Sequence, residues 1–168
     1  MTGESFSRDC LDLFQCLEEA RVKALIVGGQ AVIYYGFPRL TGDIDLFYEN
    51  TQENVIRLWD ALDIFWEGSI PGIESRDELQ VKGMVFQFGI PPNRIDLINQ
   101  IEGVDFQEAW EERTDENIRL DDKEVTIHYI GLDALIRNKS VLSRPKDLED
   151  LKYLEEVKKI RSENRETR

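Results

Sequence analysis

The chain has 168 residues and a formal net charge of −13, and 41 % of its residues are hydrophobic. This length and composition fit one core-forming domain, whereas the excess of acidic side chains argues against a large non-specific nucleic-acid surface, which needs basic patches. No apolar run approaches the roughly 20 residues of a membrane-spanning helix, so we expect no membrane contact.

The N-terminal segment and the two cysteines indicate a cytoplasmic location. Residues 1–10 lack a basic region followed by an apolar one, so we expect no signal peptide. Cys10 and Cys16 do not have the spacing of zinc ligands, and a disulfide within one helix would be strained. We therefore expect reduced thiols.

The first third of the chain predicts a helix, a buried strand and a second helix. Apolar residues recur at three- and four-residue steps over 5–22, which is typical of an amphipathic helix. Residues 24–27 form a short continuous apolar run, which favours a buried strand. The run ends at Gly28-Gly29, and helical spacing follows until Pro38 breaks it.

A pair of carboxylates marks the next predicted strand. Alternation places Asp43 and Asp45 on one face and Ile44 and Leu46 on the other. Two carboxylates this close repel each other unless a cation lies between them or one is protonated. Hard oxygen ligands on a rigid strand suit Mg²⁺, although such a pair also occurs on the surface of edge strands.

The remaining elements follow from periodicity and from turn residues. They are a helix capped by Asn50 or Thr51, an irregular connection over 66–80, strands over 81–88 and 94–98 joined by a turn at 89–93, a short helix over 106–112, a hairpin of 116–121 and 124–130, a helix over 131–140, and a last helix opened by Pro145. From residue 158 the chain is nearly all polar. We therefore predict one domain over 1–157 and a frayed or disordered charged tail over 158–168.

Asp96 is an acid inside the apolar strand 94–98. Burying a carboxylate without a partner costs several kcal/mol, in order of magnitude. We therefore expect a cation or a hydrogen-bond donor close to Asp96.

The order of these motifs resembles the DNA polymerase β-like nucleotidyltransferase superfamily. The resemblance rests on Gly28-Gly29 opening a helix, on Asp43-x-Asp45 after thirteen intervening residues, and on Asp96 in a following strand. Small prokaryotic nucleotidyltransferase-like proteins, including AbiEii-type toxins of toxin–antitoxin pairs, look most similar.

The resemblance implies a metal-dependent site. Asp43 and Asp45 would bridge two Mg²⁺ ions, with Mn²⁺ as an alternative. Asp96 would bind one ion and help to deprotonate the attacking hydroxyl. Phosphoryl-type transfer depends on charge neutralisation and in-line positioning, which agrees with this role.

The resemblance also implies a nucleotide pocket. Gly28 and Gly29 would cradle the triphosphate through backbone donors, although a plain tight turn explains the same residues. Lys139 would contact phosphate and Arg144 would support the pocket, and both also fit ordinary solvated charges at helix ends. Arg39 either steers phosphate or pairs with a surface carboxylate.

We expect an α/β (α+β) nucleotidyltransferase fold, in which helices flank a small mixed sheet and C-terminal helices close the pocket. The implied activity moves NMP from an NTP to a hydroxyl acceptor, which is RNA, protein or a small molecule, and releases pyrophosphate. The alternative is a non-catalytic nucleotide-binding protein, or a toxin–antitoxin interaction protein with a cognate partner, on the same fold.

Overall fold

The structure is a computed structural model and describes residues 6–167. Its helices are α1 (Arg8–Glu19), α2 (Gly28–Tyr34), α3 (Gln52–Phe65), the 3₁₀ helix η2 (Arg76–Gln80), α4 (Phe106–Glu111), α5 (Leu132–Leu142) and α6 (Pro145–Glu166). Its strands are β1 (Ala24–Val27), β2 (Asp43–Tyr48), β3 (Val85–Phe88), β4 (Arg94–Ile98), β5 (Thr114–Leu120) and β6 (Lys123–Tyr129).

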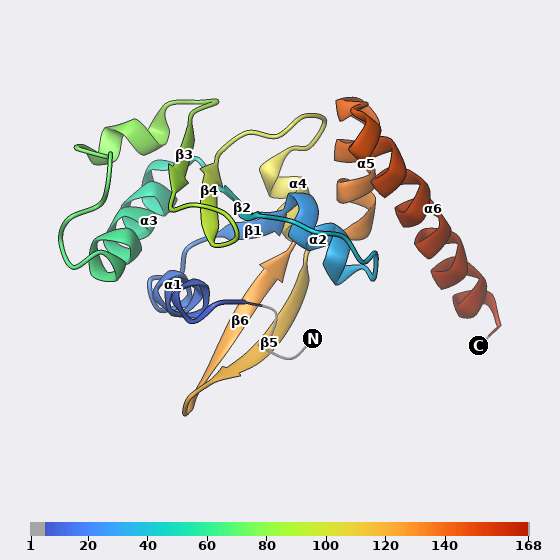
Figure 1. The fold of residues 1–168 in the computed structure, drawn as a ribbon, viewed down its shortest axis with the longest axis horizontal. Coiled ribbons are helices and arrows are strands. Elements are labelled where there is room, and N and C mark those ends of the chain that lie inside the picture. Colours follow the sequence, from blue (N-terminus) through green and yellow to red (C-terminus); the bar gives the residue numbers. More distant parts are fainter. Residues whose placement is uncertain (1–5, 168) are drawn as a thin grey trace.

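The strands form one mixed sheet in the order β3-β4-β2-β1-β6-β5. β1 pairs antiparallel with β2 and parallel with β6, while β2 pairs parallel with β4. The hairpin partners β3 and β4, and β5 and β6, are antiparallel. Figure 1 shows helices around this sheet, with α1 and α3 on one side and α5 and α6 at the opposite end of the molecule. The predicted mixed α/β fold is therefore confirmed.

Alternation along the strands separates two cores. On β2, Ile44 and Leu46 pack into the core that also holds the buried residues of α1 and α3. Phe47 points to the other face, into the core formed with α2, α4, α5 and α6. Asp43 and Asp45 share the face of Phe47, because they lie an even number of residues from it.

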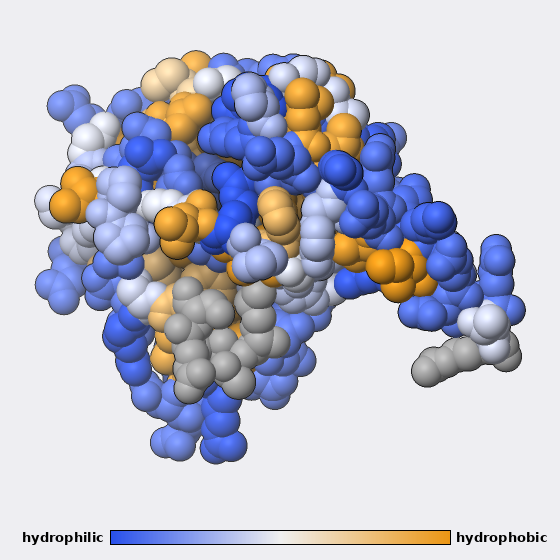
Figure 2. All heavy atoms as spheres, turned by 45° about the vertical axis from the view of Figure 1, so that its right-hand side comes forward, coloured by the Kyte–Doolittle hydropathy of each residue, from blue (hydrophilic) through white to orange (hydrophobic). Residues whose placement is uncertain are grey.

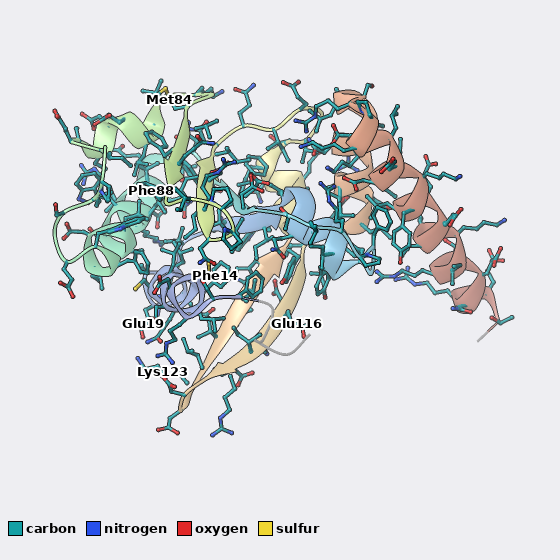
Figure 3. The ribbon with its side chains drawn as sticks, viewed as in Figure 1. Phe14, Glu19, Met84, Phe88, Glu116 and Lys123 are labelled. Atoms are coloured by element: carbon teal, nitrogen blue, oxygen red, sulfur yellow. The ribbon has the colours of Figure 1, made fainter. Side chains whose placement is uncertain are left out.

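The N-terminal helix packs against the β5–β6 hairpin through ion pairs as well as apolar contacts. Lys123 Nζ lies 2.7 Å from Glu19 Oε1, and Figure 3 shows these two side chains meeting between α1 and the hairpin. The backbone N–H of Thr126 donates to Glu18 Oε2 at 2.7 Å. Ser7 caps α1, so the helix is shorter than the predicted 5–22, of which residue 5 lies outside the described part of the chain.

Two predictions between α3 and β4 need correction. The connection predicted to be irregular over 66–80 contains η2, which Ser75 and Glu78 cap reciprocally. The strand predicted from residue 81 begins only at Val85, because Gly83 adopts φ +79° and donates its N–H to Asn99 Oδ1 at 2.9 Å. A turn therefore occupies the first residues of the predicted strand.

Helix α6 continues to Glu166, whereas the sequence predicts a frayed or disordered tail from residue 158. Long-range contacts hold this segment: Lys158 Nζ lies 3.0 Å from Asp133 Oδ1, and the Arg161 guanidinium lies over the Tyr35 ring. Both contacts come from distant parts of the chain, which local composition does not reveal. In Figure 2 the outer part of α6 forms an arm with mostly hydrophilic side chains.

No helix among residues 6–167 is long and apolar enough to cross a membrane. Cys10 and Cys16 are free thiols.

Candidate metal and nucleotide site

Strand register brings three carboxylates together. The parallel pairing of β2 with β4 sets Asp45 opposite Asp96 and Asp43 opposite Arg94. One ligand oxygen from each of Asp43, Asp45 and Asp96 lies within 4.8 Å of the other two. β2 lies between β1 and β4, so the acids are not a surface pair on an edge strand. Three carboxylate oxygens in this arrangement could hold a divalent cation.

The electrostatics of Asp45 reveal an excess of negative charge. Burial, followed by the neighbouring charges of Asp43 and Asp96, raises the pKa of Asp45 to about 6. Lys139 and Arg94 oppose this shift. A divalent cation between the carboxylates would remove the repulsion, so the donor set fits a metal.

Arg94 bridges two of the three acids. Its Nη2 lies 2.6 Å from Asp43 Oδ2, and its Nε lies 2.9 Å from Asp96 Oδ1. Gln87 on β3 donates to the other oxygen of Asp96 at 3.2 Å. These contacts supply the cation and the donor expected beside Asp96. Arg94 was not among the predicted site residues, although its position two residues before Asp96 places both side chains on one strand face.

The glycine pair lies directly against the acids. Gly28 adopts φ +62°, and a Cβ there would lie 2.1 Å from Asp45 Oδ2. A Cβ on Gly29 would lie 2.9 Å from Thr41 Oγ1. Thr41 in turn donates to Asp43 Oδ1 at 3.0 Å. Any larger side chain at residue 28 would therefore displace a carboxylate of the site.

The three predicted cations gather around two buried acids of α6. Lys139, at the end of α5, is buried and lies 2.9 Å from both Asp147 Oδ1 and Asp150 Oδ2. Arg144 Nε lies 2.5 Å from Asp147 Oδ2, and Arg39 is paired with Asp150. The carboxylate that pairs with Arg39, that of Asp150, is therefore buried and not on the surface. Lys139 is also buried, so it is not a solvated charge at a helix end.

The ionised forms of Asp147 and Arg144 are stabilised within this ion network. Burial raises the pKa of Asp147, but hydrogen bonds from Arg144 and Lys139 outweigh it and hold the pKa below its usual range. The hydrogen bond to Asp147 raises the pKa of Arg144, and Asp45 contributes to the same shift. The network therefore lies within electrostatic range of the acid triad. Sequence analysis missed Asp150, although Asp147 and Asp150 have the spacing of one helix face.

The structure thus groups every residue that the sequence singled out. Strands β2 and β4 carry the acids, and the β1–α2 corner carries the glycines. The cations come from the α2–β2 loop, from α5 and from the N-cap residue of α6. Negative and positive groups face one another across this corner. Such an arrangement suits a metal-bound polyphosphate, whose charge needs cations on both sides.

Comparison with known proteins yields one family. A family model described as "Nucleotidyltransferase of unknown function (DUF6036)" matches residues 11–164. A search of curated proteins finds no match.

Proposed function

We propose that this chain, which belongs to the DUF6036 family of nucleotidyltransferases of unknown function, transfers NMP from an NTP to a hydroxyl acceptor in the presence of Mg²⁺. One observation carries the proposal: three carboxylates from two adjacent strands lie within 4.8 Å of one another beside a double-glycine corner. The finer resemblance to AbiEii-type toxins stays a prediction.

Asp43, Asp45 and Asp96 would hold the metal, with Mn²⁺ as an alternative to Mg²⁺ and with two ions as the expected number. When bound, the metal neutralises phosphate charge and lowers the pKa of the attacking hydroxyl. Asp96 accepts the proton of that hydroxyl. The acceptor oxygen forms a bond to the α-phosphorus, the bond from this phosphorus to the bridging oxygen breaks, and pyrophosphate leaves.

The basic residues would act on the phosphate side. Lys139 and Arg144 interact electrostatically with Asp45, and the Arg39 guanidinium lies next to Gly29. All three would supply positive charge where the triphosphate would bind. Gly28 and Gly29 would bind the phosphates through their backbone N–H groups, since a Cβ at either position would collide with Asp45 or Thr41. Asp147 and Asp150 orient the cations and are positioning residues rather than contacts of the substrate.

A labelling experiment tests this function and addresses the unknown acceptor. The protein is incubated with each α-³²P-labelled NTP, Mg²⁺ and a lysate of its host. We expect one macromolecule or small molecule to become labelled by the wild type but not by Asp45→Asn. Asp60→Asn is the matched control, because Asp60 is an exposed acid on α3, which packs on the opposite face of the sheet.

Two outcomes would contradict the proposal. Labelling by Asp45→Asn at the wild-type rate would show that the acid triad is not the catalytic centre. Tight binding of NTP and Mg²⁺ by calorimetry without any turnover would favour the non-catalytic alternative. A separate experiment tests for a cognate protein partner that binds the acidic surface. Such a partner should appear in a pull-down from the host at low salt and should dissociate at high salt, because salt screens the charges.

A further inference from the structure

A cleft lies away from the acid triad. It has a volume of about 420 Å³ and lies between the outer half of α6, the first turn of α5 and the start of β5. None of its lining residues belongs to the acid triad or to the Lys139 network. Its size falls within the range of roughly 300–1,000 Å³ that small-molecule sites occupy.

The carboxylates that line this cleft are already neutralised. Asp133 Oδ1 lies 3.0 Å from Lys158 Nζ, and Glu112 Oε2 lies 3.6 Å from Arg137 Nη2. Arg161 and Arg165 also line the cleft, and within residues 6–167 neither of them forms an ion pair. In a chain with a net charge of −13, two unpaired guanidinium groups on one cleft are a local excess of positive charge.

Arg161 is exposed and contacts a ring, and within residues 6–167 its guanidinium has no hydrogen-bond acceptor. Its guanidinium lies 5.2 Å from the centroid of the Tyr35 ring. The Tyr35 hydroxyl donates to the carbonyl of Ile130 at 2.8 Å and is buried, so the ring is fixed. A guanidinium stacked on a ring keeps its in-plane N–H groups free for an anion.

The opposite wall also offers donors. Gly131, the N-cap residue of α5, provides no side-chain cap, and a Cβ there would lie 2.3 Å from the carbonyl oxygen of Glu112. Glycine is therefore required at this corner, and the backbone N–H groups of the first turn of α5 have no capping side chain. Thr114 lines the same cleft, and its hydroxyl lies 3.5 Å from that of Tyr35.

We propose that this cleft binds a phosphate group, either free phosphate or the phosphate of a nucleotide. Arg161 and Arg165 supply charged donors from α6, and the backbone N–H groups of the first turn of α5 supply neutral ones. The site is separate from the triad: Arg161 lies 11 residues after Asp150 on one helix, a rise of about 16 Å. The proposal therefore stands whether or not the triad transfers nucleotides.

An NMR titration in EDTA tests it, because chelation keeps metal-dependent binding at the triad out of the measurement. ¹⁵N-labelled protein is titrated with inorganic phosphate and, separately, with AMP, at an ionic strength matched with NaCl. We expect saturable shifts of the amides of Thr114, Gly131 and Ser162. The probe with the lower Kd identifies whether free phosphate or a nucleotide phosphate is the better ligand.

The variants Arg161→Gln and Arg165→Gln should each raise the Kd about tenfold, the effect of losing one charge-assisted hydrogen bond. Among residues 6–167 the cations that contact a ring are Lys23, Arg113 and Arg161 but not Arg165, so the Arg165 variant separates binding from packing on Tyr35. Lys159→Gln changes the same charge on α6 outside the cleft and should alter the Kd less than about twofold. Equal effects of all three variants, or shifts centred on Gly28 and Gly29, would overturn the proposal.

Discussion

At the scale of single residues, the electrostatic cost of the site is found at Asp45, whose ionised form is disfavoured in the folded protein. Its pKa is raised to about 6, first by burial and then by Asp43 and Asp96. Because the folded state disfavours the ionised form, Asp45 lowers stability increasingly as the pH rises from its unfolded pKa of about 4 through about 6. Below that window the residue is protonated in both states and costs nothing.

Asp45→Asn should therefore stabilise the metal-free protein. At about pH 8 we expect a gain of about 1–3 kcal/mol in the free energy of unfolding, and almost no gain at about pH 4. Urea denaturation in EDTA at the two pH values measures both numbers. A gain that is the same at both, or a loss at about pH 8, would contradict the assignment of Asp45 as a strained carboxylate.

Gly28 tests how closely the backbone approaches that carboxylate. Gly28→Ala places a Cβ at 2.1 Å from Asp45 Oδ2 and also at φ +62°. Gly68→Ala is the matched control, because Gly68 has φ +86° but nothing within 4 Å of its added Cβ. We expect Gly68→Ala to lower the free energy of unfolding by about 1–2 kcal/mol through backbone strain at positive φ alone. Gly28→Ala should lower it clearly more, because its Cβ also collides with Asp45.

Thermal or urea unfolding of the two variants measures this difference. Equal destabilisation would mean that Asp45 moves aside freely, and the close approach would then have no structural consequence.

At the scale of elements, α6 is tied to α5 and to the α2–β2 loop by a buried ion network. Lys139 has a side-chain exposure of 4 % and contacts Asp147 and Asp150, whose exposures are 0 % and 2 %. Removing one partner of buried pairs leaves uncompensated charge. The network therefore holds the C-terminal helices against the site.

Lys139→Met should destabilise the fold by about 2–4 kcal/mol, because it leaves buried carboxylate charge that Arg144 and Arg39 compensate only in part. Lys159→Met, at an exposed position of the same helix pair, should change stability by less than about 0.5 kcal/mol. Chemical denaturation at neutral pH gives both values. If the two variants behave alike, the network contributes no net stability.

The local sequence pattern was sufficient to predict most helices and strands of the site, but not which strands pair with each other. Alternation along 43–48 and 94–98 correctly placed Asp43 and Asp45, and Arg94 and Asp96, on shared strand faces. The parallel register that sets Asp45 opposite Asp96 is a non-local contact, which no window of sequence contains. The same holds for the Arg94 bridge between Asp43 and Asp96, because it needs both strands at once.

At the scale of the whole molecule, the antiparallel hairpins of the sheet could be predicted from the sequence, whereas its parallel strand pairs could not. The hairpins β3–β4 and β5–β6 were predicted because turn residues join them directly. The parallel pairs β1–β6 and β2–β4 join distant segments, and burial on both sheet faces selects them. The extension of α6 to Glu166 likewise depends on Asp133 and Tyr35, far away in the chain.

The central claim is that Asp43, Asp45 and Asp96 form a metal centre, and a binding titration tests it most directly. Mn²⁺, followed by electron paramagnetic resonance with Mg²⁺ as competitor, is titrated into the wild type, Asp45→Asn and Asp60→Asn. We predict that Asp45→Asn weakens Mn²⁺ binding at least tenfold, by about 1.4 kcal/mol or more, while Asp60→Asn binds as the wild type does. Equal Mn²⁺ affinity of all three proteins would contradict the claim.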